Sequence, residues 1–376
     1  MAENWRERFD QIWKEPSKTA RQWKEKTKGK VVGFCLPDAP EEIILASGAL
    51  PLALLGKGIA FSRADAHFQS FACSYSRSLL ELIERGELDF LDAIIIPHTC
   101  DAMRAFDLVV KSMDRFEMTE SYRLPRLREN PCAEKYFREE LDRLRNKLAE
   151  LTGHYPDSEE IRQACGTLNK LKSLFGQLKK ELKDQRISAG EFFSALRASL
   201  VGDRQEMVSL IEQFLLEIKN RTPKEQGFKI ILAGKVAEPP EIIDEIERAG
   251  FVVVDDLLAL GSRWIESKVD TNIEPISALI KAQFEKLPFA GLVENREKSR
   301  AQWIIEAVRN SGAHAVIYLL QRFCEPYELE VVGIEEELKQ AQIPFLRLET
   351  DYQTSSLPPL RTRLDAFYEM LSEQIG

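Results

Sequence analysis

Two stretches of this 376-residue chain alternate short apolar runs with amphipathic helical patterns, and a long stretch without any strand pattern separates them. The first stretch contains the runs VVGFC at 31–35 and LDAIIIP at 91–97, and the second contains FKIILAG at 228–234 and HAVIYLL at 314–320. Continuous apolar runs of this kind are typical of parallel strands covered on both faces. The alternation therefore predicts an α/β fold with two parallel-sheet domains, Rossmann-like or flavodoxin-like.

Weaker patterns add a strand or two to each predicted sheet. In the first stretch we expect further strands at 51–56 and 122–127, and in the second at 251–257 and 344–351. Helical patterns fill the gaps, for example EPPEIIDEIERAG, which has prolines at its start and a glycine at its end. Each half therefore contains enough strand–helix units for a small parallel sheet of its own.

The stretch between the two halves is helical in period from about residue 133 to 220, with charges along the polar faces. Gly153, Pro156 and Gly202 interrupt it, which favours a helical insert over a continuous coiled coil. We therefore predict four segments: an N-terminal helical segment at 1–30, an N-terminal α/β domain at 31–150, a helical segment at 151–225 and a C-terminal α/β domain at 226–376.

An apolar stripe marks the predicted N-terminal helix. Trp5, Phe9, Ile12 and Trp13 recur at helical spacing and share one face. Two interpretations are open: the stripe packs onto the body of the same chain, or it forms part of a contact between subunits.

The overall charge and hydropathy exclude some classes of protein. The chain has a formal net charge of −9, which argues against a nucleic-acid partner because such proteins present a basic face. No apolar run approaches the roughly 18 residues that a membrane span requires. The first residues also lack the apolar core of a signal peptide. We therefore expect a soluble, cytoplasmic protein.

Six cysteines carry the strongest chemical signal, although no two of them form a C-x-x-C pair. Zinc-ribbon and thioredoxin interpretations therefore fail, and most lone cysteines in cytosolic proteins are small buried hydrophobes. Cys35, Cys100 and Cys324, however, each fall at or just beyond the carboxyl end of a predicted strand. Functional crevices of open α/β sheets lie beyond the carboxyl ends of the strands. A cleft between two such domains could bring cysteines of both together.

Several common catalytic motifs are absent from the sequence. There is no G-x-x-x-x-G-K-[ST] phosphate loop, no G-x-G-x-x-G after a strand and no G-x-S-x-G. The four histidines show no metal-ligand spacing. We therefore do not expect this chain to hydrolyse ATP through a P-loop or to bind a nicotinamide cofactor in the usual way.

An ordered set of segments resembles the 2-hydroxyacyl-CoA dehydratase / benzoyl-CoA reductase family over nearly the whole chain. The segment FQSFACS through LDAIIIP is most similar to the smaller subunits of the benzoyl-CoA reductase branch. The segments that carry the resemblance are, in order, GFCLPDAPEEIILASGALPLALLG, ADAHFQSFACSYSRSLLEL, LDFLDAIIIPHTCDAMRAFD, LAGKVAEPPEIIDEIERAGFVVVDDLLALGSRW, HAVIYLLQRFCEP, LETDYQ and RTRLDAFYEML.

This resemblance implies a cofactor. Cys73, Cys100 and Cys324 stand where the family places the ligands of a 4Fe–4S cluster, which we expect in the interdomain cleft, alone or as part of a double-cubane 8Fe–9S cluster. Cys35, Cys132 and Cys165 do not match those positions. Four cysteines saturate a cluster, so three ligands leave one iron open, and that iron would be the reactive centre.

The resemblance also implies an activity and partners. The chain would be the iron–sulfur subunit of an ATP-activated, low-potential enzyme that dehydrates 2-hydroxyacyl-CoA thioesters or reduces the ring of benzoyl-CoA-type substrates. Its partners would be a homologous subunit or a second copy of itself, a separate ATP-hydrolysing iron–sulfur activator protein, and the acyl-CoA substrate.

Two polar residues are further candidates. Glu42 matches an acidic residue that follows the first strand in the family, so it either acts as a catalytic group facing the substrate or is a first-turn helix carboxylate. Arg263, in GSRW, either meets a phosphate or carboxylate or is simply solvated.

Two alternatives to this function remain open from the sequence. One is a homodimeric double-cubane-cluster reductase that acts on small molecules without CoA. The other is a non-enzymatic interaction protein in which the cysteines are merely buried.

Overall fold

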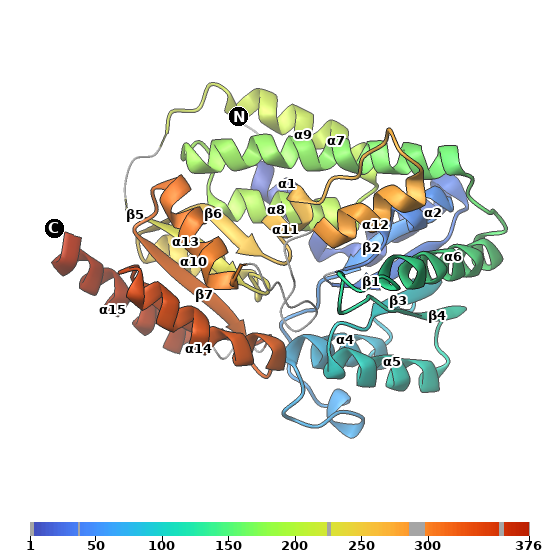
Figure 1. Cartoon of the computed structure of the whole chain (residues 1–376), viewed down its shortest axis with the longest axis horizontal. Helices are drawn as coiled ribbons and strands as arrows, with labels where there is room; N and C mark the ends of the chain where they lie inside the picture. The colour runs from blue at the N-terminus through green and yellow to red at the C-terminus, as the bar shows by residue number, and fades with distance from the viewer. Residues whose placement is uncertain (1–3, 37, 224–226, 286–297, 353–356, 376) are drawn as a thin grey trace.

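The computed structural model describes residues 4–36, 38–223, 227–285, 298–352 and 357–375. In this part of the chain the strands form two four-stranded sheets, and every pairing within them is parallel. The predicted α/β fold with two parallel sheets is therefore confirmed (Figure 1).

Both sheets have the same strand order. The first runs β2-β1-β3-β4 and the second β6-β5-β7-β8, so the first and third strands of each half lie in the centre. The strands are β1 (Val31–Cys35), β2 (Leu50–Leu54), β3 (Ala93–Pro97), β4 (Met118–Tyr122), β5 (Phe228–Gly234), β6 (Phe251–Leu258), β7 (Ala315–Gln321) and β8 (Phe345–Thr350).

The apolar runs became the buried strands because helices cover both faces of a parallel sheet. All five residues of β3 and all seven of β7 are buried. The prediction of a strand at 122–127 was wrong: β4 spans Met118–Tyr122 and ends where that run begins. β4 is an edge strand whose first three residues are only half-buried, so it has no continuous apolar run. The predicted run also contains Pro125, which lacks an amide to donate to a ladder.

The helices connect and cover these strands. They are α1 (Trp5–Lys14), α2 (Pro16–Thr27), α3 (Glu41–Ala46), α4 (Ser74–Glu84), α5 (Asp101–Met113), α6 (Ala133–Thr152), α7 (Ser158–Lys183), α8 (Ala189–Val201), α9 (Arg204–Ile218), α10 (Glu241–Arg248), α11 (Ser262–Glu266), α12 (Pro275–Glu285), α13 (Arg300–Ser311), α14 (Glu325–Gln340) and α15 (Leu357–Ile375), with a short 3-10 helix η1 at Ala64–Ala66.

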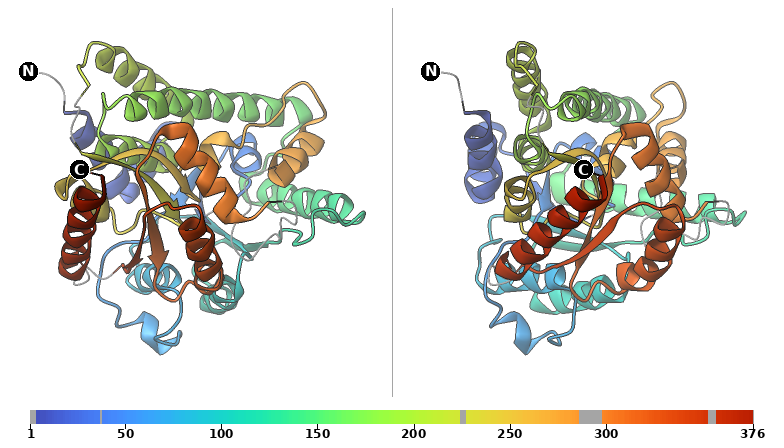
Figure 2. Two further views of the ribbon diagram at one scale, coloured as in Figure 1. Left: turned by 60° about the vertical axis from the view of Figure 1, so that its left-hand side comes forward. Right: turned by 90° about the vertical axis from the view of Figure 1, so that its left-hand side faces the viewer.

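Four helices, α6 to α9, fill the strand-free stretch as expected. Capping boxes open α7 at Asp157 and α8 at Ser188, and Gly153 ends α6 in the left-handed conformation. In Figures 1 and 2, α7 and α9 lie side by side on the opposite side of the molecule from α4 and α5. α6 crosses residue 150, and the division of the chain into domains stays a prediction.

The N-terminal stripe packs onto the body of the same chain. The rings of Trp5 and Phe9 lie 5.2 and 5.4 Å from the ring of Phe214 in α9. The Trp5 indole also donates to Glu217 at 2.6 Å. Trp5 is 3% exposed and Phe9 is fully buried, so of the two interpretations the structure favours packing onto the same chain. Their apolar surface is already covered by α9.

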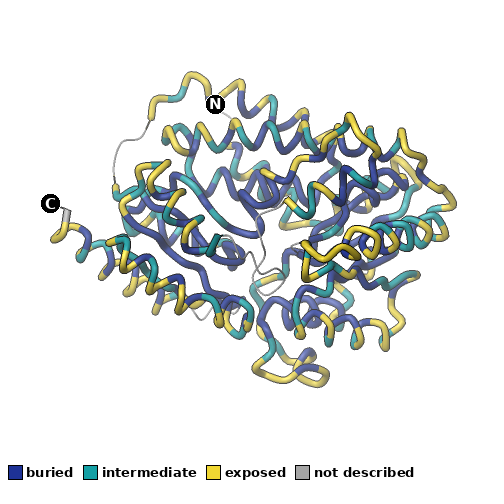
Figure 3. The backbone as a smooth tube through the Cα atoms, viewed as in Figure 1, coloured by how far each residue is buried: buried dark blue, intermediate teal, exposed yellow. Residues whose placement is uncertain are grey.

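The core of the protein follows the two sheets. The central strands β1, β3 and β7 are buried throughout, and Figure 3 shows a buried interior with the outer turns of the peripheral helices exposed. None of the helices in the described residues is long and apolar enough to cross a membrane.

Candidate functional site

Each of the three cysteines predicted as ligands stands immediately before a helix. Cys73 is the N-cap of α4, Cys100 that of α5 and Cys324 that of α14. Pro97 ends β3 and Gln321 ends β7, so Cys100 and Cys324 are each the third residue beyond equivalent strands of the two sheets. A helix N-terminus carries a partial positive charge and presents free amides, which favour a thiolate over a thiol.

The structure brings these cysteines together across the two halves of the chain. The Cys324 thiol forms a hydrogen bond with Cys73, and the ammonium Nζ of Lys235 lies 3.7 Å from the Cys73 sulfur. Cys100 is close enough to interact electrostatically with Cys73, Cys324 and Lys235. The sequence predicted the three cysteines as a set, and the fold places them at one location.

Direct contacts join the strand end that precedes Cys324 to the start of α4. The Gln321 side-chain amide donates to the Ser74 hydroxyl at 2.9 Å, and the Ser74 amide donates to the Arg322 carbonyl at 3.5 Å. Gln321 and Ser74 are both buried, so solvent does not compete for these bonds. They hold Cys73 and Cys324 beside each other.

The electrostatic environment shifts the pKa values of the three cysteines in different directions. The hydrogen bond from Cys324 holds the pKa of Cys73 below its ordinary value, against the effect of burial and with the help of Lys235. The same hydrogen bond, together with burial, raises the pKa of Cys324. Burial raises the pKa of Cys100, although Lys235 opposes the shift. Cys73 is therefore the cysteine that the protein itself best stabilises as a thiolate.

A buried carboxylate secures the long loop that leads to Cys73. Glu81 of α4 accepts backbone hydrogen bonds from Ser62, Arg63 and Ala64 at 2.8–2.9 Å, and a further bond from Arg85 at 2.8 Å. Burial alone would raise the pKa of Glu81, but these donors lower it to about 2. The loop between β2 and α4 is thus fixed to the helix that Cys73 begins.

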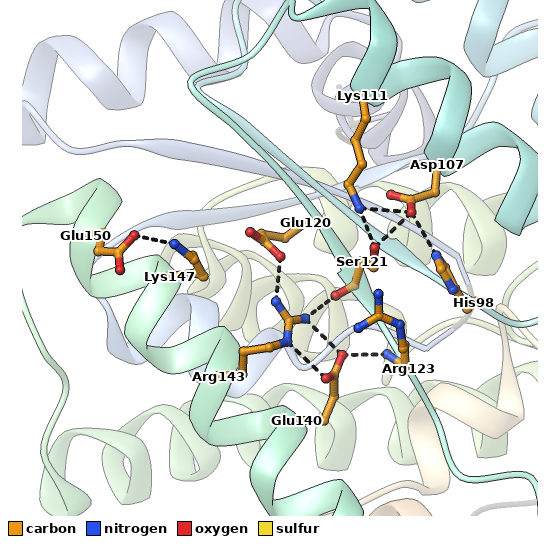
Figure 4. Close-up of polar contacts among 10 residues, drawn as sticks. All are labelled: His98, Asp107, Lys111, Glu120, Ser121, Arg123, Glu140, Arg143, Lys147 and Glu150. Carbon is orange, nitrogen blue, oxygen red and sulfur yellow. Dashed lines mark hydrogen bonds and ion pairs between the residues drawn. The ribbon is translucent and has the colours of Figure 1, made fainter.

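A polar cluster secures the loop that carries Cys100 (Figure 4). His98 Nε2 lies 2.9 Å from Asp107 of α5, which also accepts hydrogen bonds from Lys111 and the Ser121 hydroxyl. Burial would raise the pKa of Asp107, but these three partners keep it below its ordinary value. The His98 amide donates to the Tyr122 carbonyl at 2.8 Å, so the residues before Cys100 are held to both β4 and α5.

The sequence analysis missed Lys235 as a member of the site. This residue follows Gly234, the last residue of β5, which has a φ of +121° and where a Cβ would lie only 2.2 Å from the Leu319 carbonyl oxygen. A lysine directly after a strand whose last five residues are buried is the signal that could have revealed it, because a charged residue seldom enters such a position without a partner.

Of the other three cysteines, Cys35 lies near enough to Lys235 to interact with it electrostatically, whereas Cys132 and Cys165 show no contact with Lys235 in the described residues. Cys35 is fully buried beside Tyr75, and burial raises its pKa well above the ordinary value. Cys165 is buried in α7, where burial raises its pKa to about 12. Cys132 is exposed at the start of α6. Cys35 and Cys165 are thus held as neutral thiols.

Glu42 contacts the helical insert. Its carboxylate accepts a hydrogen bond at 3.2 Å from Lys172 of α7, which also donates to the Ser267 carbonyl. Glu42 is 8% exposed and lines a cavity of about 30 Å³ together with Tyr122 and Gln283. These contacts are those of a buried, ion-paired helix carboxylate. A catalytic role for Glu42 stays a prediction.

Arg263 is neither solvated nor open to a phosphate. It is 3% exposed and forms a two-point ion pair with Asp38, at 2.7 and 3.1 Å. The sequence left open whether Arg263 meets a phosphate, meets a carboxylate or is solvated. The structure shows a carboxylate partner, and this carboxylate is that of Asp38 in the same chain.

The three thiols are of the ligand type that an iron–sulfur cluster takes. In the described residues no group of three or more His, Cys, Asp or Glu side chains could hold a metal ion. A cluster is larger than an ion, and thiolates are its usual ligands. Lys235 is 5% exposed and forms no ion pair with a carboxylate in the described part of the chain, so its buried charge calls for an anionic group beside it. A thiolate-ligated cluster is such a group.

Comparisons with known proteins decide the family. The model of the family described as 2-hydroxyglutaryl-CoA dehydratase, D-component, matches residues 38–371. The chain belongs to this family. The resemblance inferred from the ordered segments is therefore confirmed, and with it the prediction that the chain is an enzyme component. The alternative of a non-enzymatic interaction protein is set aside.

Relatives within this family match almost the whole chain. It is 26% identical to a benzoyl-CoA reductase subunit of Thauera aromatica, over 94% of each chain. It is 25% identical to the (R)-phenyllactyl-CoA dehydratase beta subunit of Clostridium sporogenes, over 96% of this chain and 97% of that one. It is 26% identical to the (R)-2-hydroxyglutaryl-CoA dehydratase beta subunit of Acidaminococcus fermentans, over 93% and 94%. These relatives include both reductase and dehydratase subunits.

Proposed function

We propose that this chain is the iron–sulfur subunit of an ATP-activated, low-potential enzyme that acts on CoA thioesters, by 2-hydroxyacyl-CoA dehydration or benzoyl-CoA-type ring reduction. The observation that carries the proposal is the convergence of Cys73, Cys100 and Cys324 around the buried ammonium of Lys235, in a chain of this family. Three thiols and one buried cation make a site that suits an anionic metal cluster.

The protein's own contribution is to place the three sulfurs near one another, each at the start of a helix. Each precedes a helix whose amides and dipole favour negative charge. Cys73 and Cys324 come from opposite halves of the chain, so ligation would fasten the two sheets together. When bound by these three residues, a 4Fe–4S cluster would supply low-potential electron transfer and one iron without a protein ligand.

In this proposal Glu42 has the role of a proton-transfer or substrate-positioning residue. Its support is that the carboxyl is buried and faces a small cavity between α3, β4 and α12 rather than bulk solvent. Lys172 would hold the carboxylate in place and favour its ionised form.

The proposed partners follow from the names of the relatives, which are subunits of larger enzymes. We propose that a homologous subunit or a second copy of this chain binds beside it, and that a separate ATP-hydrolysing activator protein supplies the electron. The cluster would be a single cube or part of an 8Fe–9S double cubane. The cellular location would be the cytoplasm.

The decisive experiment starts from anaerobically purified protein. Iron and acid-labile sulfide are measured first, and both are expected in amounts matching one cluster per chain. The protein is then combined with candidate partner subunits, activator and ATP, and tested on 2-hydroxyacyl-CoA and benzoyl-CoA thioesters. Iron- and sulfide-free protein would refute the proposal. Native mass and iron per dimer distinguish a heteromer from a homodimeric double-cubane reductase.

A further inference from the structure

Lys235 is a buried lysine among the three cysteines, and its contacts indicate what its positive charge does. Lys235 Nζ lies 3.7 Å from the Cys73 sulfur and 4.7 Å from the centre of the Tyr75 ring. Lys235 is 5% exposed, so its side chain is almost completely enclosed by the protein. The ammonium group is therefore buried, with the Cys73 sulfur and the face of the Tyr75 ring beside it.

Such a charge has to be balanced by a nearby anion. Other buried cations of the chain have carboxylates: Arg204 pairs with Glu41 at 2.7 Å, and Arg197 with Glu238 at 2.8 Å. Lys235 is different in the described residues, where its contacts are a sulfur and a ring face. An unbalanced ammonium in such a place is costly, so the negative charge belongs to the cysteine site itself.

We propose that Lys235 is a positioning residue that raises the reduction potential of the cluster held by Cys73, Cys100 and Cys324. The inference rests on the proposed function. Reduction adds one electron, and so one negative charge, to the cluster, which the activator's electron supplies. A fixed positive charge beside a ligand sulfur stabilises the reduced form more than the oxidised form. Because the site is buried, salt and solvent screen this effect weakly.

The position of Lys235 in the fold supports a dedicated role. It comes from the loop after β5 in the second sheet, whereas Cys73 begins α4 beside the first sheet. The Ala259 amide donates to the Lys235 carbonyl at 2.8 Å, which fixes the backbone. The ammonium is thus held at a ligand by a rigid loop, rather than by the flexible reach of a surface side chain.

The test is a redox titration of anaerobic protein, followed by electron paramagnetic resonance, with iron content measured on the same samples. Lys235→Met and Lys235→Gln remove the charge, and Lys235→Arg retains it. The matched control is Lys179→Met, which removes a mostly buried lysine that pairs with Asp255 at 2.7 Å, away from the cysteines. We expect the uncharged variants to shift the reduction equilibrium at least tenfold toward the oxidised cluster, which lowers the midpoint potential by about 59 mV. Lys235→Arg and Lys179→Met should keep the wild-type potential.

Each other outcome has a defined meaning. Uncharged variants with the wild-type potential overturn the inference, and so does a Lys235→Arg variant that shifts as far as Lys235→Met. If both uncharged variants lose their iron, a Lys235→Arg variant that keeps its iron supports the role of the charge. A Lys235→Arg variant that also loses its iron overturns the inference. Wild-type protein without iron and sulfide defeats the proposed function itself, while an intact wild-type cluster with unshifted variants defeats only the inference on Lys235.

Discussion

The carboxylate of Asp38 accepts two hydrogen bonds from the guanidinium of Arg263, although 225 residues separate them in the chain. Asp38 follows β1 of the first sheet, and Arg263 lies in α11, which follows β6 of the second. Both are almost completely buried. Neighbouring acids behave alike, since Glu41 pairs with Arg204 and Glu42 with Lys172. The acidic segment around α3 therefore fastens the first sheet to the rest of the protein.

The Asp38–Arg263 pair should be important for stability. Arg263→Met is expected to lower the free energy of unfolding by about 3–5 kcal/mol, because it leaves a buried carboxylate without its main partner. Chemical denaturation of the cluster-free protein measures this. The control is Arg104→Met, which removes an exposed pair with Asp101 and should cost less than about 1 kcal/mol. Equal effects of the two substitutions would contradict the structural role of the buried pair.

The cysteine assignment predicts a division among five of the six cysteines. Cys73→Ser, Cys100→Ser and Cys324→Ser should each lose most of the bound iron and sulfide, together with activity. Cys132→Ser and Cys165→Ser are the matched controls and should retain both, because one is exposed and the other is buried in α7. Iron and sulfide analysis of anaerobic protein decides. Full iron in Cys100→Ser would remove that residue from the ligand set.

The proposed role of Glu42 makes a separate prediction. Glu42→Gln should leave the cluster content unchanged and slow turnover by about 10²–10⁴-fold, the usual contribution of a general acid or base. Turnover is measured with partner and activator supplied. Glu41→Gln provides the control, because Glu41 is an equally buried, ion-paired carboxylate of the same helix. Full activity in Glu42→Gln would show that the residue is structural.

Glu81 should make stability depend on acid pH. Its pKa in the folded protein is lowered to about 2 from an ordinary value of 4.5, so its contribution is complete above pH 4.5 and is lost as the pH falls toward 2. Glu81→Gln should therefore cost about 2–3 kcal/mol at pH 7, and the difference from wild type should shrink between about pH 4.5 and 3. Urea unfolding at several pH values tests this. A difference that does not change with pH would mean that the charge of Glu81 contributes nothing.

Much of the fold was predictable from local patterns. The run FKIILAG became β5 at the predicted residues, because its last five residues are buried in the sheet and carry no polar side chain. Segment 133–220 was correctly predicted as helical from its 3.6-residue period. The edge strand β4 was misplaced, because its half-buried residues carry no such run. The fate of the N-terminal stripe was also undecided, since an amphipathic face does not say what covers it.

The sequence by itself determined the helices and central strands, the family through its ordered motifs, and the identity of the three candidate cysteines. All of these follow from short-range periodicity or from residues in a fixed order along the chain. Only the tertiary structure decided that Cys73 contacts Cys324, that Lys235 lies beside Cys73, and that Arg263 forms an ion pair with Asp38. These pairings join residues more than 150 positions apart, and the packing of the two sheets, which no local pattern encodes, sets which of them come within contact distance.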